Sequence, residues 1–138
     1  MASAALGYSQ VSAQVDAFLD PLAFAALPSR PETFNAYARE AIVSSVVSGV
    51  LSEIDPVALS ALRSLPSYQS EMFGVTVGQP IEKTVDLLTS CGNINLVHID
   101  PEQLDADYRK LHEICEKGIF LVDSLEVPAT PPAAAYGY

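Results

Sequence analysis

Basic residues and cysteines are scarce in this chain. Its 138 residues include 7 lysines and arginines against 17 acids, and the net charge is −10. The cations are scattered along the sequence, whereas a protein that grips nucleic acid gathers them on one face. The charge balance therefore argues against a nucleic-acid partner and against docking onto an anionic membrane. The two cysteines are too few for a disulfide framework, which favours an intracellular or intra-organellar setting over secretion.

Long hydrophobic runs are also missing. The longest nearly continuous apolar run, residues 41–51, contains three serines and one glycine. It is far shorter than the roughly 20 residues that cross a bilayer. No cation precedes Arg30, so the sequence shows no basic start of a secretory signal peptide. We therefore expect no direct membrane span and no secretory signal.

The motifs of common enzymes are absent as well. The sequence has no phosphate loop, no dinucleotide-binding fingerprint and no Gly-x-Ser-x-Gly elbow. Cys91 follows the C-terminal end of a helix expected over residues 80–90, where the helix dipole raises a thiol pKa. An activated cysteine–histidine nucleophile is thus disfavoured. We predict that the protein is not an enzyme and uses no cofactor.

Charged residues of both signs are few. They make up 17% of the chain, below the roughly 25% typical of soluble domains, while hydrophobic residues make up 49%. This content is sufficient for a core. A surface with so few charges is typical of a subunit that neighbouring chains cover in part.

What the sequence does contain is the dipeptide Asp-Pro three times. Each copy follows an aliphatic residue and stands before an apolar residue four positions past the aspartate. An aspartate can cap the free N–H groups of a helix start, and proline suits the first helical position because its missing N–H is not needed there. The sequence therefore predicts three helices, beginning at Asp20, Asp55 and Asp100.

These signals and the hydrophobic pattern predict a mainly α fold. We expect a single domain over residues 1–127 with five or six short helices around a central buried helix at about residues 31–53. That segment starts with a capping box at residues 29–32 and is apolar all round its axis from residue 42. A minor β element is expected at residues 72–77 and 94–99. Residues 128–138 are rich in proline, alanine and tyrosine and are expected to form a separate extended tail.

Two further helices have distinct faces. Residues 9–19 place Val11, Val15, Phe18 and Leu19 on one side of a helix. Residues 100–117 form the clearest amphipathic helix. Its acids are expected to make a solvated face: Glu102, Asp105, Asp107, Glu113 and Glu116.

The cysteines and histidines all fall within 25 residues of one another and are the weak candidates for a metal site: Cys91, His98, His112 and Cys115. Four such ligands can hold a tetrahedral zinc ion. The six residues between Cys91 and His98 exceed the usual two-to-four-residue knuckle, however. A buried thiol beside unrelated histidines is the simpler interpretation, and we predict no metal.

The C-terminal tail is the predicted partner-binding segment. Its prolines favour an extended polyproline conformation that loses little entropy on docking. Aromatic residues are enriched at the centres of interfaces. The residues expected to contact a partner are Pro131, Pro132, Tyr136 and Tyr138.

Together these observations favour a non-catalytic structural or accessory subunit of a larger protein assembly, docked through its apolar surface and its tail. Two alternatives remain open. One is a carrier of a small ligand or pigment, with a pocket lined by a stripe of small residues on the central helix: Ala38, Ala41, Ser45 and Ser48. The other is a self-assembling coat or filament protein.

Overall fold

Helices and strands contribute comparably to the fold. The computed structural model describes residues 2–31 and 33–123, with 37% helix and 26% strand in two three-stranded antiparallel sheets. The fold is therefore mixed α/β, and the prediction of a mainly α bundle is wrong. The tail residues, Pro131, Pro132, Tyr136 and Tyr138 among them, lie outside the described residues.

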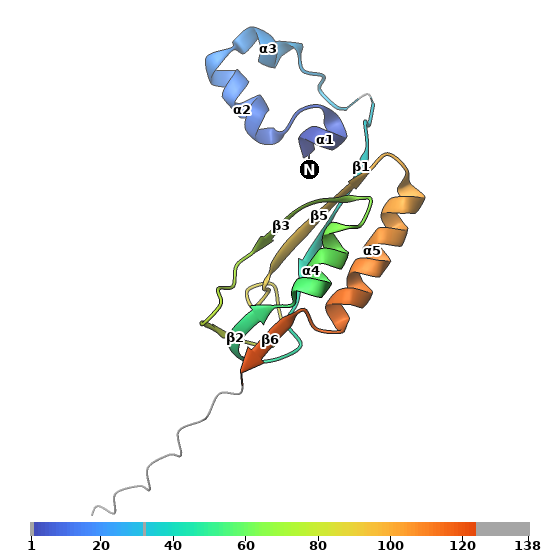
Figure 1. Ribbon diagram of the computed structural model, residues 1–138. Coiled ribbons are helices and arrows are strands. Elements are labelled where there is room, and N and C mark those ends of the chain that lie inside the picture. The colour runs from blue at the N-terminus through green and yellow to red at the C-terminus, as the bar shows by residue number, and fades with distance from the viewer. Residues whose placement is uncertain (1, 32, 124–138) are drawn as a thin grey trace, which may run out of the picture.

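The chain begins with a helical arm. It consists of α1 (Ala2–Leu6), α2 (Gln10–Leu19) and α3 (Pro21–Ala26). Ser9 caps α2 by accepting a hydrogen bond from the Ser12 N–H (3.0 Å), while Ser12 Oγ accepts one from the Ser9 N–H (2.9 Å). The helix predicted over residues 9–19 is thus confirmed. Figure 1 shows the arm beyond the N-terminal end of β1, apart from the sheets.

Two sheets form the rest of the described chain. One has the order β1-β5-β3, with β1 (Tyr37–Val43), β5 (Gly92–His98) and β3 (Tyr68–Phe73). The other has the order β4-β2-β6, with β4 (Pro80–Ile81), β2 (Gly49–Ile54) and β6 (Phe120–Asp123). The strand expected at residues 94–99 is confirmed as β5. The one expected at residues 72–77 lies earlier in the sequence, since β3 ends at Phe73.

Both remaining helices cover the same side of the first sheet. They are α4 (Pro56–Arg63) and α5 (Pro101–Glu116), which lie next to each other in Figure 1. Leu104 and Leu111 of α5 pack into one core with Ala41, Ile94 and Leu96 of the strands. Side chains alternate between the faces of a strand, so this packing buries one face of the sheet and leaves the other uncovered.

The three Asp-Pro helix starts are confirmed. The Asp20 carboxylate accepts a hydrogen bond from the Ala23 N–H (3.0 Å) at the start of α3. Asp55 accepts from two N–H groups of α4, at 2.8 and 3.3 Å. Asp100 accepts from the Glu102 N–H (2.9 Å) at the start of α5. Each proline occupies the first helical turn.

The predicted central helix at residues 31–53 does not exist, and residues 37–53 form β1, a connecting loop and most of β2. Five β-branched residues lie between positions 42 and 50, and such side chains favour strands over helices. Burial alternates with a period of two, because Ala41, Val43 and Ser45 are buried while the residues between them are exposed. A Cβ on Gly49 would lie 2.7 Å from the Asp123 carbonyl oxygen, so glycine there permits the pairing of β2 with β6.

The helix expected at residues 80–90 is also wrong, because side chains replace its backbone hydrogen bonds. The Val85 and Asp86 N–H groups donate to Thr89 Oγ1 (2.9 and 3.1 Å), and the Thr89 N–H donates to the Asp86 carboxylate (3.0 Å). The Thr84 hydroxyl donates to the Thr89 carbonyl at 2.9 Å. Such local bonds compete with helix formation and fix a loop instead.

The acidic face of α5 needs one correction. Asp107 is buried, at 4% exposure, and is not part of the solvated face. Its carboxylate accepts hydrogen bonds from the Ser67 N–H and from Gln103 Nε2, both at 2.8 Å. The Ser67 carbonyl in turn accepts from the Val97 N–H of β5 (2.7 Å). Asp107 therefore links α5 to the turn before β3 and, through it, to β5.

We predict that Gly92→Ala destabilises the fold by more than about 2 kcal/mol. Gly92 has φ of +145°, and an added Cβ would lie 2.2 Å from the Met72 carbonyl oxygen. Gly74→Ala is the matched control, because nothing lies within 4 Å of its added Cβ and it should change stability by less than about 1 kcal/mol. Urea unfolding followed by circular dichroism compares the two variants. Equal stabilities would contradict the close packing of β3 against β5.

Candidate functional site

Exposed apolar side chains lie along both α2 and α3. We call them the apolar arm surface, which consists of Val11, Val15, Phe18, Leu19, Leu22 and Phe24. Phe18, Leu19 and Leu22 are each at least 80% exposed. Single exposed apolar residues are common on proteins, but a contiguous apolar patch marks a site of interaction.

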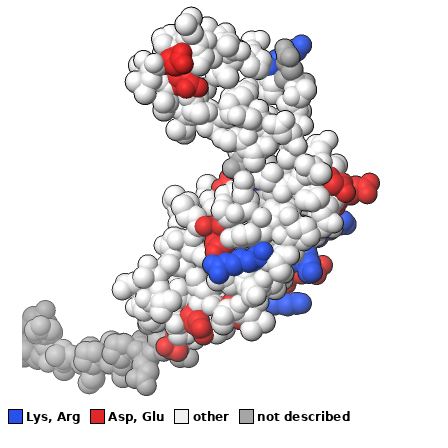
Figure 2. All heavy atoms as spheres, turned by 45° about the horizontal axis from the view of Figure 1, so that its top comes forward, with Lys and Arg blue, Asp and Glu red and all other residues white. Residues whose placement is uncertain are grey.

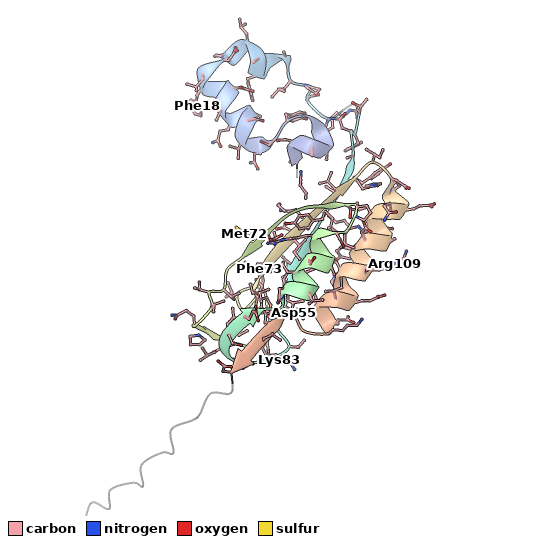
Figure 3. All side chains as sticks on the ribbon, in the orientation of Figure 1. Phe18, Asp55, Met72, Phe73, Lys83 and Arg109 are labelled. Atoms are coloured by element: carbon pink, nitrogen blue, oxygen red, sulfur yellow. The ribbon has the colours of Figure 1, made fainter. Side chains whose placement is uncertain are left out.

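The sequence of α2 explains why this surface forms. Val11, Val15 and Phe18 are separated by four and then three positions, which puts them on one side of a helix. The stripe was predicted, and the structure leaves it outside the core, since α2 has no buried residue. Figure 3 shows Phe18 on α2, well away from the sheets.

The arm is anchored through α1 rather than through α2 or α3. Ala5 of α1 is buried, and its carbonyl accepts a hydrogen bond from the Asn35 N–H (2.7 Å), just before β1. Figure 1 shows α2 running away from β1 and α3 crossing the far end of the arm. Because α1 makes this contact, the apolar arm surface on α2 and α3 stays exposed to solvent.

Charges are nearly absent from the arm. The first 29 residues hold Asp16 and Asp20 as their only charged side chains. Figure 2 shows a mostly white arm with one red cluster on its visible face and a blue group at its edge, while most red and blue atoms lie on the rest of the chain. A surface of this kind offers an apolar contact and no electrostatic steering of a charged partner.

A shallow hollow lies within the apolar arm surface. It has a volume of about 300 Å³ and is lined by Val11, Gln14, Val15, Phe18 and Leu19. Gln14 supplies the only polar side chain of this lining. The hollow can receive an apolar side chain of a partner, and it holds no acid, base or nucleophile for a reaction.

A second concave region lies on the uncovered face of the first sheet. It is a groove of about 530 Å³ whose lining includes Ile42 of β1, Met72 of β3 and Leu87 from the adjacent loop. Figure 3 labels Met72 at the end of β3. Asn93 Nδ2 donates to Glu40 Oε1 (2.8 Å) on the groove wall, so these two polar groups already satisfy each other.

The structure does not bring together the four candidate metal ligands. Cys91 directly precedes β5 and His98 ends it, so about 23 Å separates them at the usual rise per residue of a strand. His112 and Cys115 share a hollow with Glu116 on α5. Within residues 2–31 and 33–123, no three histidine, cysteine or acidic side chains are grouped to hold a metal ion. The geometry gives no support to a zinc centre.

Neither cysteine is activated for nucleophilic attack. Cys91 is 2% exposed, and burial raises the pKa of its thiol. Burial also raises the pKa of Cys115, to about 11. His112, three residues before Cys115, packs edge-on against the Tyr108 ring with 4.5 Å between ring centroids. Both thiols are therefore protonated near neutral pH, and the neutral thiol is the unreactive form.

The four small residues that were expected to line the pocket of a ligand carrier do not lie on one face. Ala38, Ala41, Ser45 and Ser48 were expected on one helical stripe, but Ala38 and Ala41 belong to β1. Residues three apart in a strand point to opposite faces. Accordingly, Ala41 and Ser45 are buried whereas Ala38 and Ser48 are exposed.

Comparison with known proteins does not assign this chain to a family. The chain matches no protein-family model, no curated protein and no solved structure. No helix within the described ranges has the length and apolar character needed to cross a membrane. The case for a function rests on the surfaces described above.

We predict that Cys115 reacts slowly with iodoacetamide at pH 8. With a pKa of about 11 instead of 9.0, its thiolate fraction falls roughly a hundredfold. A Cys91→Ser variant isolates Cys115, and the same variant unfolded in urea supplies the reference rate. The folded rate should keep rising above pH 10, where the unfolded rate has levelled off. Equal rates at pH 8 would contradict the burial of this thiol.

Proposed function

We propose that this protein is a non-catalytic structural or accessory subunit of a larger protein assembly and that it docks through the apolar arm surface. The observation that carries the proposal is the exposure of Phe18, Leu19 and Leu22 at one end of the chain. An isolated chain gains nothing from keeping these side chains in water. A partner that covers them gains the free energy of their burial.

The size of that gain supports docking. The six side chains of the apolar arm surface expose on the order of 600 Å², whose burial is worth about 15 kcal/mol before costs. Association costs about 4–15 kcal/mol in lost motion. The gain exceeds this cost except at the upper end of that range, so a specific complex forms if the partner's surface fits closely. No comparable gain is available from the few charges of the arm.

The two protonated thiols and the self-satisfied polar groups of the groove further support a non-catalytic role. We infer that the neighbours of this subunit are other protein chains. An apolar surface with two acids and no cation gives no attraction for nucleic acid.

We predict that Phe18→Glu removes the protein from its assembly. A carboxylate at the centre of a dry interface loses its hydration without gaining a partner, which should weaken docking at least a hundredfold. Val57→Glu is the matched control, because Val57 is 76% exposed on α4 outside the apolar arm surface. The native mass of the complex, isolated gently from the source of the protein, is compared for both variants.

The proposal fails if Phe18→Glu and Val57→Glu enter the assembly equally well, or if the unaltered protein is recovered only as a free chain of 14.7 kDa. Circular dichroism of both variants excludes unfolding as the cause of a loss. Because Phe18 contributes nothing to the core, neither substitution should change the stability of the sheets.

The second proposed contact is the tail, with Pro131, Pro132, Tyr136 and Tyr138. It lies outside the described residues and stays a prediction. A chain lacking residues 128–138 tests it in the same assay. Unchanged assembly would remove the tail from the proposal and leave the apolar arm surface in place.

A small-ligand carrier is the second candidate, and the groove on the uncovered sheet face favours it. Its volume of about 530 Å³ falls within the usual range of ligand pockets, roughly 300–1,000 Å³. Native mass spectrometry of the protein from its source should then show a bound molecule that Met72→Glu removes. Detection of the bare chain mass alone would end this alternative.

A further inference from the structure

We propose that the groove on the uncovered face of the β1-β5-β3 sheet binds a small amphipathic amine. The apolar body of the ligand rests on Ile42 and Met72, and its ammonium group meets the Glu40 carboxylate. The inference does not depend on the apolar arm surface. It rests on the second candidate function, the small-ligand carrier, and names the chemical class of the ligand.

The strand register divides this face of the sheet into an apolar row and a polar row. Asn93 of β5 is paired with Ile42 on one side and with Met72 on the other, so these side chains cross the sheet in one row. Two residues further along the strands, Glu40 is paired with Asn95. Residues two apart on a strand are separated by about 7 Å. A ligand that covers both rows therefore needs an apolar part and a polar group at about this spacing.

Glu40 supplies the charge that selects an amine. It is the only charged residue in the lining of the groove. Asn93 Nδ2 donates to Glu40 Oε1 at 2.8 Å, which orients the carboxylate but leaves its negative charge unbalanced. Arg39, the preceding residue, faces α5 and pairs with Asp105, and no basic side chain in the described part of the chain pairs with Glu40. An ammonium group supplies the missing charge and donates hydrogen bonds to the carboxylate.

The charge of the whole chain acts in the same direction. A net charge of −10 raises the local concentration of small cations and lowers that of anions. A fatty acid or another apolar anion would bring a like charge to Glu40 and is a poorer occupant. An uncharged apolar molecule would remove water from Glu40 without replacing its hydrogen bonds.

The apolar part of the groove is exposed and held in position. Met72 and Leu87 are 65% and 70% exposed. Leu87 belongs to the loop that hydrogen bonds to Thr89 fix, and Thr84 ties this loop to the chain just after β1. The Thr84 N–H donates to the Ser45 carbonyl, and the Ser45 N–H donates to Thr84 Oγ1, both at 2.9 Å. A wall held in this way needs little ordering when a ligand binds.

Two probes of the same shape test the proposal on the full chain. Naphthylethylamine carries an ammonium group, and naphthylethanol replaces it with a neutral hydroxyl. In isothermal titration calorimetry we expect the amine to bind about tenfold more tightly, because hydrogen bonds between charged groups are stronger than those of neutral ones. Added salt should weaken the binding of the amine and leave that of the alcohol unchanged.

Substitutions separate the charge from the apolar contact. Glu40→Gln removes the charge and keeps an oxygen that accepts the bond from Asn93, so it should abolish the preference for the amine. Glu53→Gln is the matched control, because it changes the net charge equally from an exposed position on β2. Leu87→Ala should weaken both probes about threefold or more. Val57→Ala, at a site 76% exposed on α4, should weaken neither.

Equal affinity of the unaltered chain for the two probes would overturn the inference. So would a preference for the amine that survives Glu40→Gln, or no binding of the amine at about 1 mM. None of these outcomes bears on docking through the apolar arm surface, which the Phe18→Glu assay tests. A neutral molecule found on the native protein and lost with Met72→Glu would overturn the amine and keep the carrier. A bare chain mass from the source, with neither probe bound, would end both.

Discussion

The packing of α5 against one face of the β1-β5-β3 sheet is the contact on which the rest of the structure depends. Leu104 and Leu111 fill the core over the strands, and buried Asp107 joins the helix to the turn before β3 through its bond to the Ser67 N–H. A buried carboxylate with two hydrogen-bond donors stabilises this arrangement only while both bonds are made. Because α4 lies on the same side, the core is complete without the arm and without the opposite face of the sheet.

The separation of this core from the arm and from the uncovered face of the sheet explains where the candidate sites lie. Residues that the core does not need are free to serve contacts, and they form the apolar arm surface and the groove beside Met72. The helices of the arm are short, and helices shorter than about 12 residues are marginal in water without packing. Ser9 and Asp20 cap their starts, but no core supports α2. A covering partner therefore stabilises the arm as well as burying its apolar side chains.

Short sequence motifs predicted the structure correctly where the contacts they make are with residues nearby in the sequence. The three Asp-Pro starts and the helix capped by Ser9 follow from contacts within a few positions, whereas β5, predicted from its alternating pattern, pairs with the distant strands β1 and β3. The prediction of a helix at residues 31–53 was wrong because a valine-rich run is equally compatible with a buried helix and with a buried strand. Only the pairing of Ala41 with Ile94 and of Leu51 with Val122, far apart in the sequence, selects strands. The stripe on α2 was visible in the sequence, but its exposure depends on the placement of the whole arm.

The central claim is that protein covers the apolar arm surface when this chain performs its role. Hydrogen–deuterium exchange of the chain within its native assembly, compared with the free chain, tests it most directly. The account predicts slower exchange in peptides from residues 10–26 and unchanged exchange in α5, whose amides the core already protects. Identical exchange of residues 10–26 in both states would contradict it.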